Sequence, residues 1–104
     1  MRQGADPAKT TRARFEAHAT DARCAACHNT IDNLGFVFEN FDGMGVARAT
    51  ENGVPVDTQV TISVGSDFDG TYASSVELAG ARAQSDSVKS CFARQLFAHP
   101  PPTR

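Results

Sequence analysis

The sequence predicts a small, mainly α-helical domain with a short β-hairpin insertion between its early and late helices. Three observations predict this fold class. Residues that cap helices precede stretches of helix formers near both ends of the chain. An Asn-Gly pair between short apolar runs, at 52–53, predicts a hairpin in the middle. The length of 104 residues suits one compact domain with one modest core.

The first half of the chain is predicted to hold two helices. The Asp-Pro pair at 6–7 is typical of a helix start and predicts a helix from about 7 to 19. Thr or Asp at 20–21 can cap a short second helix that carries residues 24–28. The turn formers Asn and Gly, within 33–35, predict that this helix ends there.

The second half is predicted to hold the β insertion and two more helices. A short helix or tight turn is expected at 36–43, a hairpin at 46–58 and a strand at 59–64. A loop at 65–72 and two helices, at 76–83 and 88–99, follow. The proline tail at 100–102 ends the last helix. Five residues at helical spacing are expected on its inner side: Val88, Cys91, Phe92, Gln95 and Leu96.

The motif CAACH, residues 24–28, carries the chemistry. Cysteines three apart on a helix share a face, so both can meet one flat ligand. C-x-x-C-H is the attachment pattern of a c-type haem, in which two thiols form thioethers with the vinyl groups and the histidine binds the iron. The sequence therefore predicts one covalent haem c, with its iron, held by Cys24, Cys27 and His28. A flat cofactor of this size would also supply apolar area to the four helices around it.

Three other interpretations of the motif remain. A zinc site needs four ligands, and only Cys91, His18 and His99 are left to complete one. A thioredoxin-like dithiol needs a βαβ context, whereas the residues before the motif are predicted to be helical. The last alternative is two structural or exposed cysteines beside a surface histidine. Cys91 is expected to be a buried, small apolar residue.

The segment RARFEAHATDARCAACHNTIDNLGFVFENFDGMG, residues 12–45, resembles the C-terminal cytochrome-type domain of large, mostly uncharacterised proteins of planctomycetes and myxobacteria. In that family a pattern close to R-x-R-x-E-x-H precedes the haem motif, and a segment like G-F-x-x-E-N-F-D follows it. The likeness runs from about residue 12 to 97. Ile31 stands where the family often has Met, and the end of the chain departs from the family's close. The resemblance implies a c-type haem and says little about a reaction.

The sixth ligand of the iron is left open by the sequence. Met44 lies on a Gly-rich turn and is the first candidate, with His18 as the alternative, and a methionine ligand would raise the potential. His99 or an open iron site are the remaining options. Phe36 and Phe41 are expected to line the haem pocket.

Several acidic residues invite a functional interpretation that loop chemistry explains better. Glu39 and Asp42 could form an acid–base pair, but capping and turn bonding are the simpler prediction. Asp67 and Asp69 loosely suggest a calcium loop, yet their spacing does not fit an EF-hand.

Electron transfer through the single haem is the function that these features predict. The expected partner is a redox protein or an adjacent domain of a longer chain. The alternative is a haem enzyme or gas-binding module, peroxidase-like or a sensor, with an open distal iron site. An electron carrier is favoured over an enzyme, because no distal acid–base pair is evident in the sequence.

Charge and hydropathy argue against nucleic acid as a partner and against a membrane span, and the haem motif indicates where the domain is located. The net charge is −2 and no basic block is present, so nucleic acid is not expected. No stretch is long and apolar enough to span a membrane, and the N-terminus lacks a signal peptide. Covalent haem attachment normally takes place outside the cytoplasm. Residues 1–104 are therefore expected to be one domain from a longer exported chain, in the periplasm or at the cell surface.

Overall fold

The computed structural model describes residues 9–99 and 102. The elements in chain order are α1 (Thr11–His18), α2 (Ala22–Phe36), β1 (Thr50–Glu51), β2 (Val54–Pro55), β3 (Val60–Ile62), β4 (Gly70–Tyr72), α3 (Ser75–Gln84) and α4 (Asp86–Ala98). The protein is mainly α-helical with a small β insertion, as predicted. The helix start expected at 6–7 and the prolines at 100–101 lie outside the described residues.

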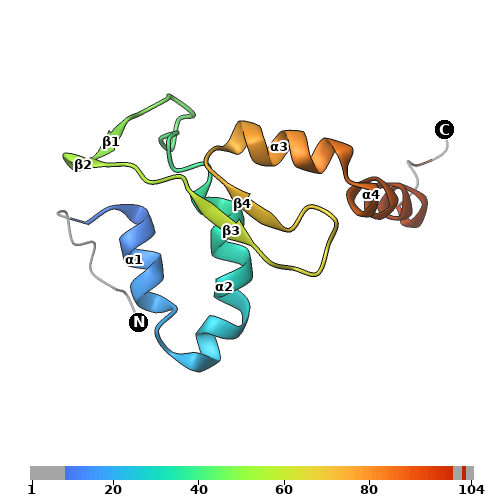
Figure 1. Cartoon of the computed structure of the whole chain (residues 1–104), viewed down its shortest axis with the longest axis horizontal. Helices are drawn as coiled ribbons and strands as arrows, with labels where there is room; N and C mark the ends of the chain where they lie inside the picture. Colours follow the sequence, from blue (N-terminus) through green and yellow to red (C-terminus); the bar gives the residue numbers. More distant parts are fainter. Residues whose placement is uncertain (1–8, 100–101, 103–104) are drawn as a thin grey trace.

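Helices α1 and α2 form an antiparallel helical hairpin, closed by a turn at 19–21 (Figure 1). The Thr10 side chain caps α1 by accepting a hydrogen bond from the backbone N–H of Ala13 at 3.2 Å. Asp21 caps α2 by accepting from the N–H of Arg23 at 2.9 Å. The Asp cap predicted at 20–21 is therefore confirmed.

Helix α2 is longer than predicted, because it continues to Phe36 instead of ending at 33–35. The side chain of Asn33 donates to the carbonyl of Asn29 within the helix and to the carbonyl of Thr61 in β3, each at 3.1 Å. Asn is a typical turn former, but here its side chain links α2 to strand β3. Tertiary contact thus overrides the local preference for a turn.

The β insertion consists of two antiparallel two-stranded ribbons, β1–β2 and β3–β4. The β1–β2 hairpin is the predicted one. Asn52 and Gly53, with φ of 52° and 78°, occupy the left-handed positions that this tight turn requires. Strand β4 was predicted as loop. Its pairing with β3 depends on Asp69, whose carboxylate accepts from the N–H groups of Val64, Gly65 and Ser66 and closes the loop between the strands.

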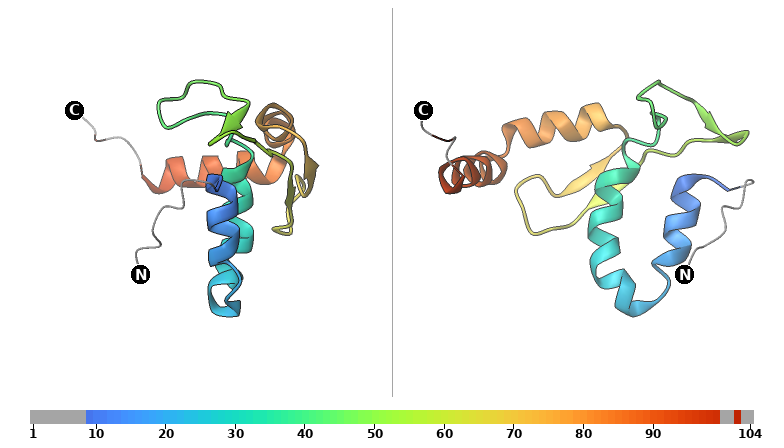
Figure 2. Two further views of the ribbon diagram at one scale, coloured as in Figure 1. Left: turned by 90° about the vertical axis from the view of Figure 1, so that its left-hand side faces the viewer. Right: turned by 180° about the vertical axis from the view of Figure 1, so that it is seen from behind.

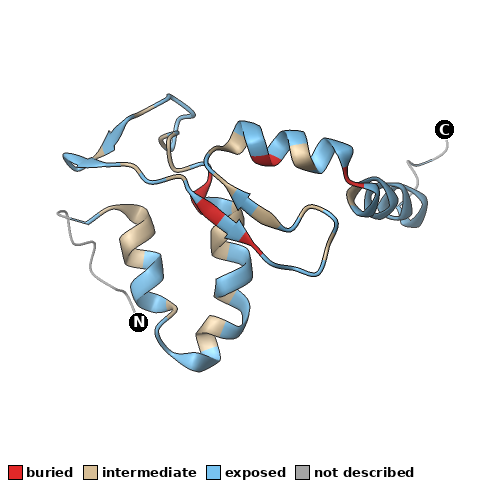
Figure 3. Ribbon diagram, viewed as in Figure 1, coloured by how far each residue is buried: buried red, intermediate tan, exposed pale blue. Residues whose placement is uncertain are grey.

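The buried core is small and lies where α2, the β3–β4 ribbon and α3 meet (Figure 3). It comprises Phe36, Val37, Val60, Ile62 and Leu78, with Leu34, Phe68 and Tyr72 packed against it. The radius of gyration is 16.6 Å, against about 13 Å for a compact chain of this length. The molecule is therefore open rather than spherical.

The late helices extend away from the helical hairpin. Helix α3 follows β4, and α4 lies at the far side of the molecule from the turn at 19–21 in Figure 1 and in the view from behind (Figure 2, right). The expectation that four helices surround one centre is therefore wrong: of the four described helices, only α1 flanks the first turns of α2.

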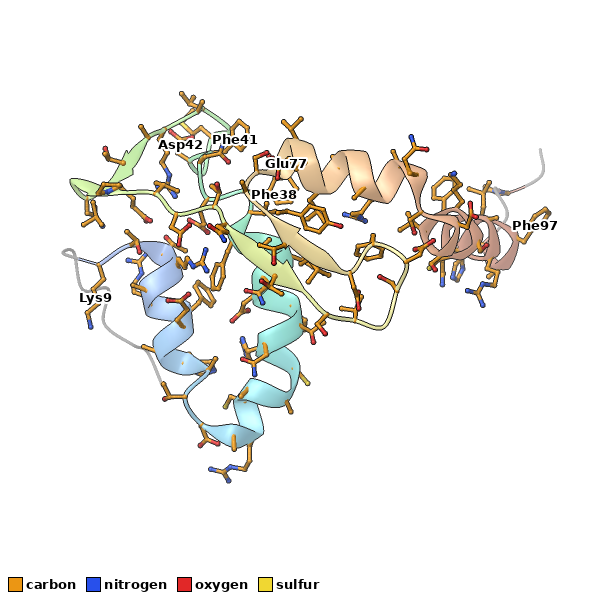
Figure 4. All side chains as sticks on the ribbon, in the orientation of Figure 1. Lys9, Phe38, Phe41, Asp42, Glu77 and Phe97 are labelled. Carbon is orange, nitrogen blue, oxygen red and sulfur yellow. The ribbon has the colours of Figure 1, made fainter. Side chains whose placement is uncertain are left out.

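The inner face predicted for α4 is wrong as well, because α4 buries no side chain along its described length. Phe92 and Leu96 are exposed, and Phe97 projects outward (Figure 4). Cys91 is exposed rather than buried. Among the described residues, no helix is long and apolar enough to cross a membrane.

Candidate functional site

The CAACH motif forms the first turns of α2, next to the turn that joins α2 to α1. Cys24 and Cys27 are free thiols, the first partly exposed and the second exposed. Their spacing of three places them on one helix face, as predicted. His28 follows Cys24 by one full turn and lies on the same side. Two sulfurs and one imidazole therefore project from a single stretch of helix surface.

His28 is held in one orientation by Asp32, one turn further along α2. The imidazole Nδ1 lies 3.1 Å from both carboxylate oxygens of Asp32. An ionised carboxylate can only accept, so this contact places the proton on Nδ1 and leaves the Nε2 lone pair available to a metal. A carboxylate behind a ligating histidine is the usual support for such a ligand. The Asp32 side chain is only 12% exposed, which keeps the contact partly shielded from water.

Helix α1 brings a second histidine to the same place. The ring centroids of His18 and His28 lie 5.0 Å apart, with the rings edge to face at 77°. His18 is the last residue of α1 and is exposed. The structure thus brings together Cys24, Cys27, His28 and the alternative sixth ligand.

The first candidate for the sixth ligand lies elsewhere. Met44 is 91% exposed at the tip of a turn that follows the opposite end of α2. Its N–H, and that of Val46, donate to the Asp42 carboxylate at 2.8 and 2.9 Å. These bonds lower the pKa of Asp42 below its ordinary value. The turn chemistry predicted for Asp42 is therefore what the structure contains.

The two expected pocket phenylalanines also lie at that opposite end. Phe36 is buried in the core, with the guanidinium of Arg12 packed 5.1 Å from its ring centroid. Phe41 is half-exposed at the start of the Met44 turn, where Figure 4 shows it beside Asp42. The structure does not bring either ring to the CAACH motif. His99, the C-cap of α4, is distant as well.

A polar network that sequence reasoning missed fixes α1 against the β insertion. The carboxylate of Glu51 in β1 accepts from the N–H and hydroxyl of Thr11 at 2.7 and 2.6 Å. It also lies 3.7 Å from Arg14 and 3.6 Å from Arg48. Burial acts to raise the pKa of Glu51, but the Thr11 bonds and the two arginines outweigh it and lower the pKa. No spacing rule in the sequence pairs residues 40 positions apart, so this network carried no local signal.

Glu39 belongs to the same network and is not part of an acid–base pair. Its carboxylate binds Arg48 at 3.0 Å. Burial, followed by the nearby charge of Glu51, raises the pKa of Glu39 despite the two arginines. Its role in the structure is to hold the segment after α2 against the hairpin.

The carboxylates of Asp67 and Asp69 both accept hydrogen bonds from other residues of the chain. Asp67 accepts from the hydroxyl of Ser85 at 2.5 Å and from the N–H of Asp86 at 2.8 Å, which fastens the loop to the start of α4. Asp69 closes its own loop. Within the part of the chain that the structure describes, no group of three or more His, Cys, Asp or Glu side chains is placed to hold a metal ion.

The zinc and dithiol interpretations of the motif gain no support from its surroundings, whereas the exposure of Cys27 agrees with the third interpretation, exposed cysteines beside a surface histidine. Helix α4, which carries Cys91, lies across the molecule from the first turns of α2 (Figure 1). A zinc site that uses Cys91 is therefore not assembled. The motif follows a helix, and both described ribbons are antiparallel, so the βαβ frame of a thioredoxin-like dithiol is not found among the described elements.

The surface around the motif suits a flat apolar group. Ile31 follows Cys27 by one turn on the same face of α2, and 64% of it is exposed. Phe15 precedes His18 by one turn on α1 and is 47% exposed. Isolated exposed apolar residues are common, but here they flank two thiols and two imidazoles. The donor set and its apolar border therefore fit a haem.

Comparison with known proteins gives one partial match. Residues 1–51 match the family model PSCyt3, described as a protein of unknown function (DUF1588). This match supports the coarser part of the resemblance drawn from the sequence, a planctomycete domain family related to cytochromes c. It covers just under half of the chain, including the whole of α1 and α2. No curated protein and no solved structure matches the chain.

Proposed function

We propose that this protein is an electron-transfer domain that carries one covalently attached haem c on the first turns of α2. The observation that carries the proposal is the joint placement of Cys24, Cys27 and His28 on one helix face, with Asp32 behind the imidazole. A bound haem supplies an iron that accepts one electron from a reduced partner and returns it to an oxidised one.

The residues of α2 perform three tasks in this proposal. Cys24 and Cys27 would hold the haem: each thiol would add across one vinyl group, with sulfur on one carbon and the thiol hydrogen on the other, so that nothing is released. His28 offers its Nε2 lone pair to the metal, because Asp32 keeps the proton on Nδ1. The negative charge of Asp32 also makes the imidazole a stronger donor, which favours the ferric state.

The apolar residues beside the motif limit the access of water. Ile31 and Phe15 would lose part of their exposed surface against the macrocycle. At about 25 cal/mol per Å² of apolar surface, this burial stabilises the loaded protein relative to the free chain. The redox partner is a second protein or a neighbouring domain of a longer chain. Attachment of this kind places the domain outside the cytoplasm.

The test is production of the full chain together with haem-attachment machinery, followed by denaturing electrophoresis with haem staining. The proposal expects a haem that stays with the polypeptide under denaturing conditions, and loss of that stain in a Cys24→Ser and Cys27→Ser double variant. Cys91→Ser is the matched control, since Cys91 lies on α4 and should leave the attached haem unchanged.

Spectra then separate electron transfer from the enzyme or gas-binding alternative. A six-coordinate haem gives sharp reduced bands that carbon monoxide does not shift, and it cycles between ferric and ferrous states with a small mediator. Wild-type protein without covalent haem would refute the proposal. Covalent haem that binds carbon monoxide readily would replace electron transfer by the open-site alternative.

A further inference from the structure

We propose that His18 is the second protein ligand of the haem iron, so that the metal lies between the imidazoles of His18 and His28. This inference rests on the proposed haem attachment and assigns the ligand that the sequence leaves open. It selects a residue of α1 in place of the methionine on the Gly-rich turn.

The placement of the candidates decides between them. The His18 ring lies 5.0 Å from the His28 ring, centroid to centroid. Met44 belongs to a turn beyond the other end of α2, and its backbone is fixed there by the Asp42 carboxylate. A methionine in that turn could reach the motif only if the Asp42 bonds broke and the segment after α2 left its place.

The contacts at the open end of the helical hairpin hold α1 in this register. Arg12 packs over Phe36, and its guanidinium also donates to the carbonyl of Gln59 at 2.7 Å. His18 lies six residues after Arg12 on α1, and His28 lies eight residues before Phe36 on antiparallel α2. At 1.5 Å per residue these separations are about 9 and 12 Å, so the two imidazoles lie within about one helical turn of the same level of the hairpin.

The link between the two helices would run past the edge of the macrocycle, on the side that the cysteines hold. Residues 19–21 join His18 to the helix that carries Cys24, so the chain crosses from one side of the group to the other at its thioether edge. Accommodating a flat group requires the two rings to move apart. The Glu51 and Arg12 contacts that anchor α1 lie at the far end of the helix from His18, so they do not fix the position of the His18 ring directly.

Two histidine ligands have defined chemical consequences. With imidazoles on both sides, the iron has no vacant position for carbon monoxide or peroxide. The potential is lower than with a methionine ligand, since methionine raises it. The site is then specific for outer-sphere transfer of single electrons, which suits an exposed edge near Cys27.

The experiment compares ferric and ferrous spectra of full-length, haem-loaded wild-type protein with those of His18→Ala and Met44→Leu. We expect low-spin iron that resists carbon monoxide in the wild type and in Met44→Leu. His18→Ala should lose the low-spin signal in electron paramagnetic resonance, bind carbon monoxide in its ferrous form, and recover the wild-type spectrum with added imidazole. Recovery by a free ligand is a readout that a merely structural role for His18 would not produce.

His18→Met keeps the test decisive if the alanine variant folds poorly. It should retain a six-coordinate iron with a histidine–methionine spectrum and a higher midpoint potential. The inference is overturned if Met44→Leu loses the low-spin signal, or if the ligand spectrum of the wild type persists unchanged in both His18 variants. Covalently bound haem in every variant shows that such a result concerns the sixth ligand, whereas its absence from the wild type refutes the attachment itself.

Discussion

Removal of the Glu51 carboxylate should weaken the attachment of α1, the helix that carries His18, to the β insertion. Glu51 accepts two hydrogen bonds from Thr11, at 2.7 Å from the backbone N–H and 2.6 Å from the hydroxyl. This N–H is one of the first in α1, so the carboxylate from β1 caps the helix. Its negative charge also interacts favourably with the positive end of the helix dipole. Glu51→Ala removes both acceptors and the charge.

The expected loss of stability follows from these contacts. A hydrogen bond to a charged group contributes about 1.5–3 kcal/mol, and partial access of water to Thr11 places both bonds at the lower end of that range. The ion pairs with Arg14 and Arg48, at 3.7 and 3.6 Å, add little because screened pairs contribute about 0–1 kcal/mol each. Glu51→Ala should therefore cost about 3 kcal/mol. Glu51→Gln keeps one acceptor oxygen and should cost about 1 kcal/mol.

The assay is urea unfolding followed by circular dichroism, with every variant in the same haem state. Amide hydrogen exchange locates the effect and should accelerate in α1 more than in α3. Glu16→Gln is the matched control, since its pair with Arg12 joins positions four apart on an exposed helix surface. That variant should change stability by about 0.5 kcal/mol or less. Unfolding of Glu51→Ala at the wild-type midpoint, or equal exchange in α1 and α3, would refute the reasoning.

Three further predictions concern the site, the response to acid and the hairpin. Asp32→Asn removes the negative charge behind His28, so the midpoint potential of the attached haem should rise in a spectroelectrochemical titration. The hydrogen bond from the Ser85 hydroxyl, together with those from N–H groups of α4, lowers the pKa of Asp67 below its ordinary value of 3.8 and outweighs burial, which acts to raise it. Asp67 therefore contributes stability that is complete above that value and is lost as pH falls through its lower folded-state pKa, and Asp67→Asn should flatten the acid limb of the unfolding midpoint against pH. Gly53→Ala forces a side chain into a residue with φ of 78° and should cost about 1 kcal/mol in thermal unfolding.

Each of these predictions has an outcome that contradicts it. An unchanged or lowered potential in Asp32→Asn would show that the carboxylate does not act on the iron through the imidazole. An acid limb as steep in Asp67→Asn as in the wild type would assign the acid sensitivity to other carboxyl groups, such as Asp69, whose pKa is lowered by the N–H of Val64. A Gly53→Ala variant as stable as the wild type would mean that the β1–β2 turn adds little to the fold. Ala49→Gly is a control in the same segment, because it changes a residue whose φ is not positive and so does not test the left-handed turn.

Motifs that act within one or two turns of a helix were predictable from the sequence. The shared face of Cys24 and Cys27 follows from the period of the α-helix alone. The caps of three helices and the Asn52-Gly53 turn depend on the conformations of a few neighbouring residues. Even Asp32, one turn after His28, could have been found by that spacing rule.

Features that depend on distant partners were not predictable in this way. The local preference of Asn33 for a turn gives way to its bond with Thr61, and β4 exists only because the Asp69 loop returns it to β3. The apolar spacing of α4 predicted a buried face, but the chain directs this helix away from the core. Periodicity reports which residues of a helix share a face and does not report what that face contacts.

The sequence by itself determined the motif on which the proposed function rests: two thiols and an imidazole on one helical surface, a pattern typical of covalent haem attachment. Only the tertiary structure decided which candidate for the second ligand lies beside the motif. It placed His18 beside His28 and Met44 at the other end of α2, through contacts of Glu51 and Arg12 with residues about 24 to 47 positions away. Such contacts depend on how the chain folds back on itself, because spacing along one helix carries no information about which distant segment will lie beside it.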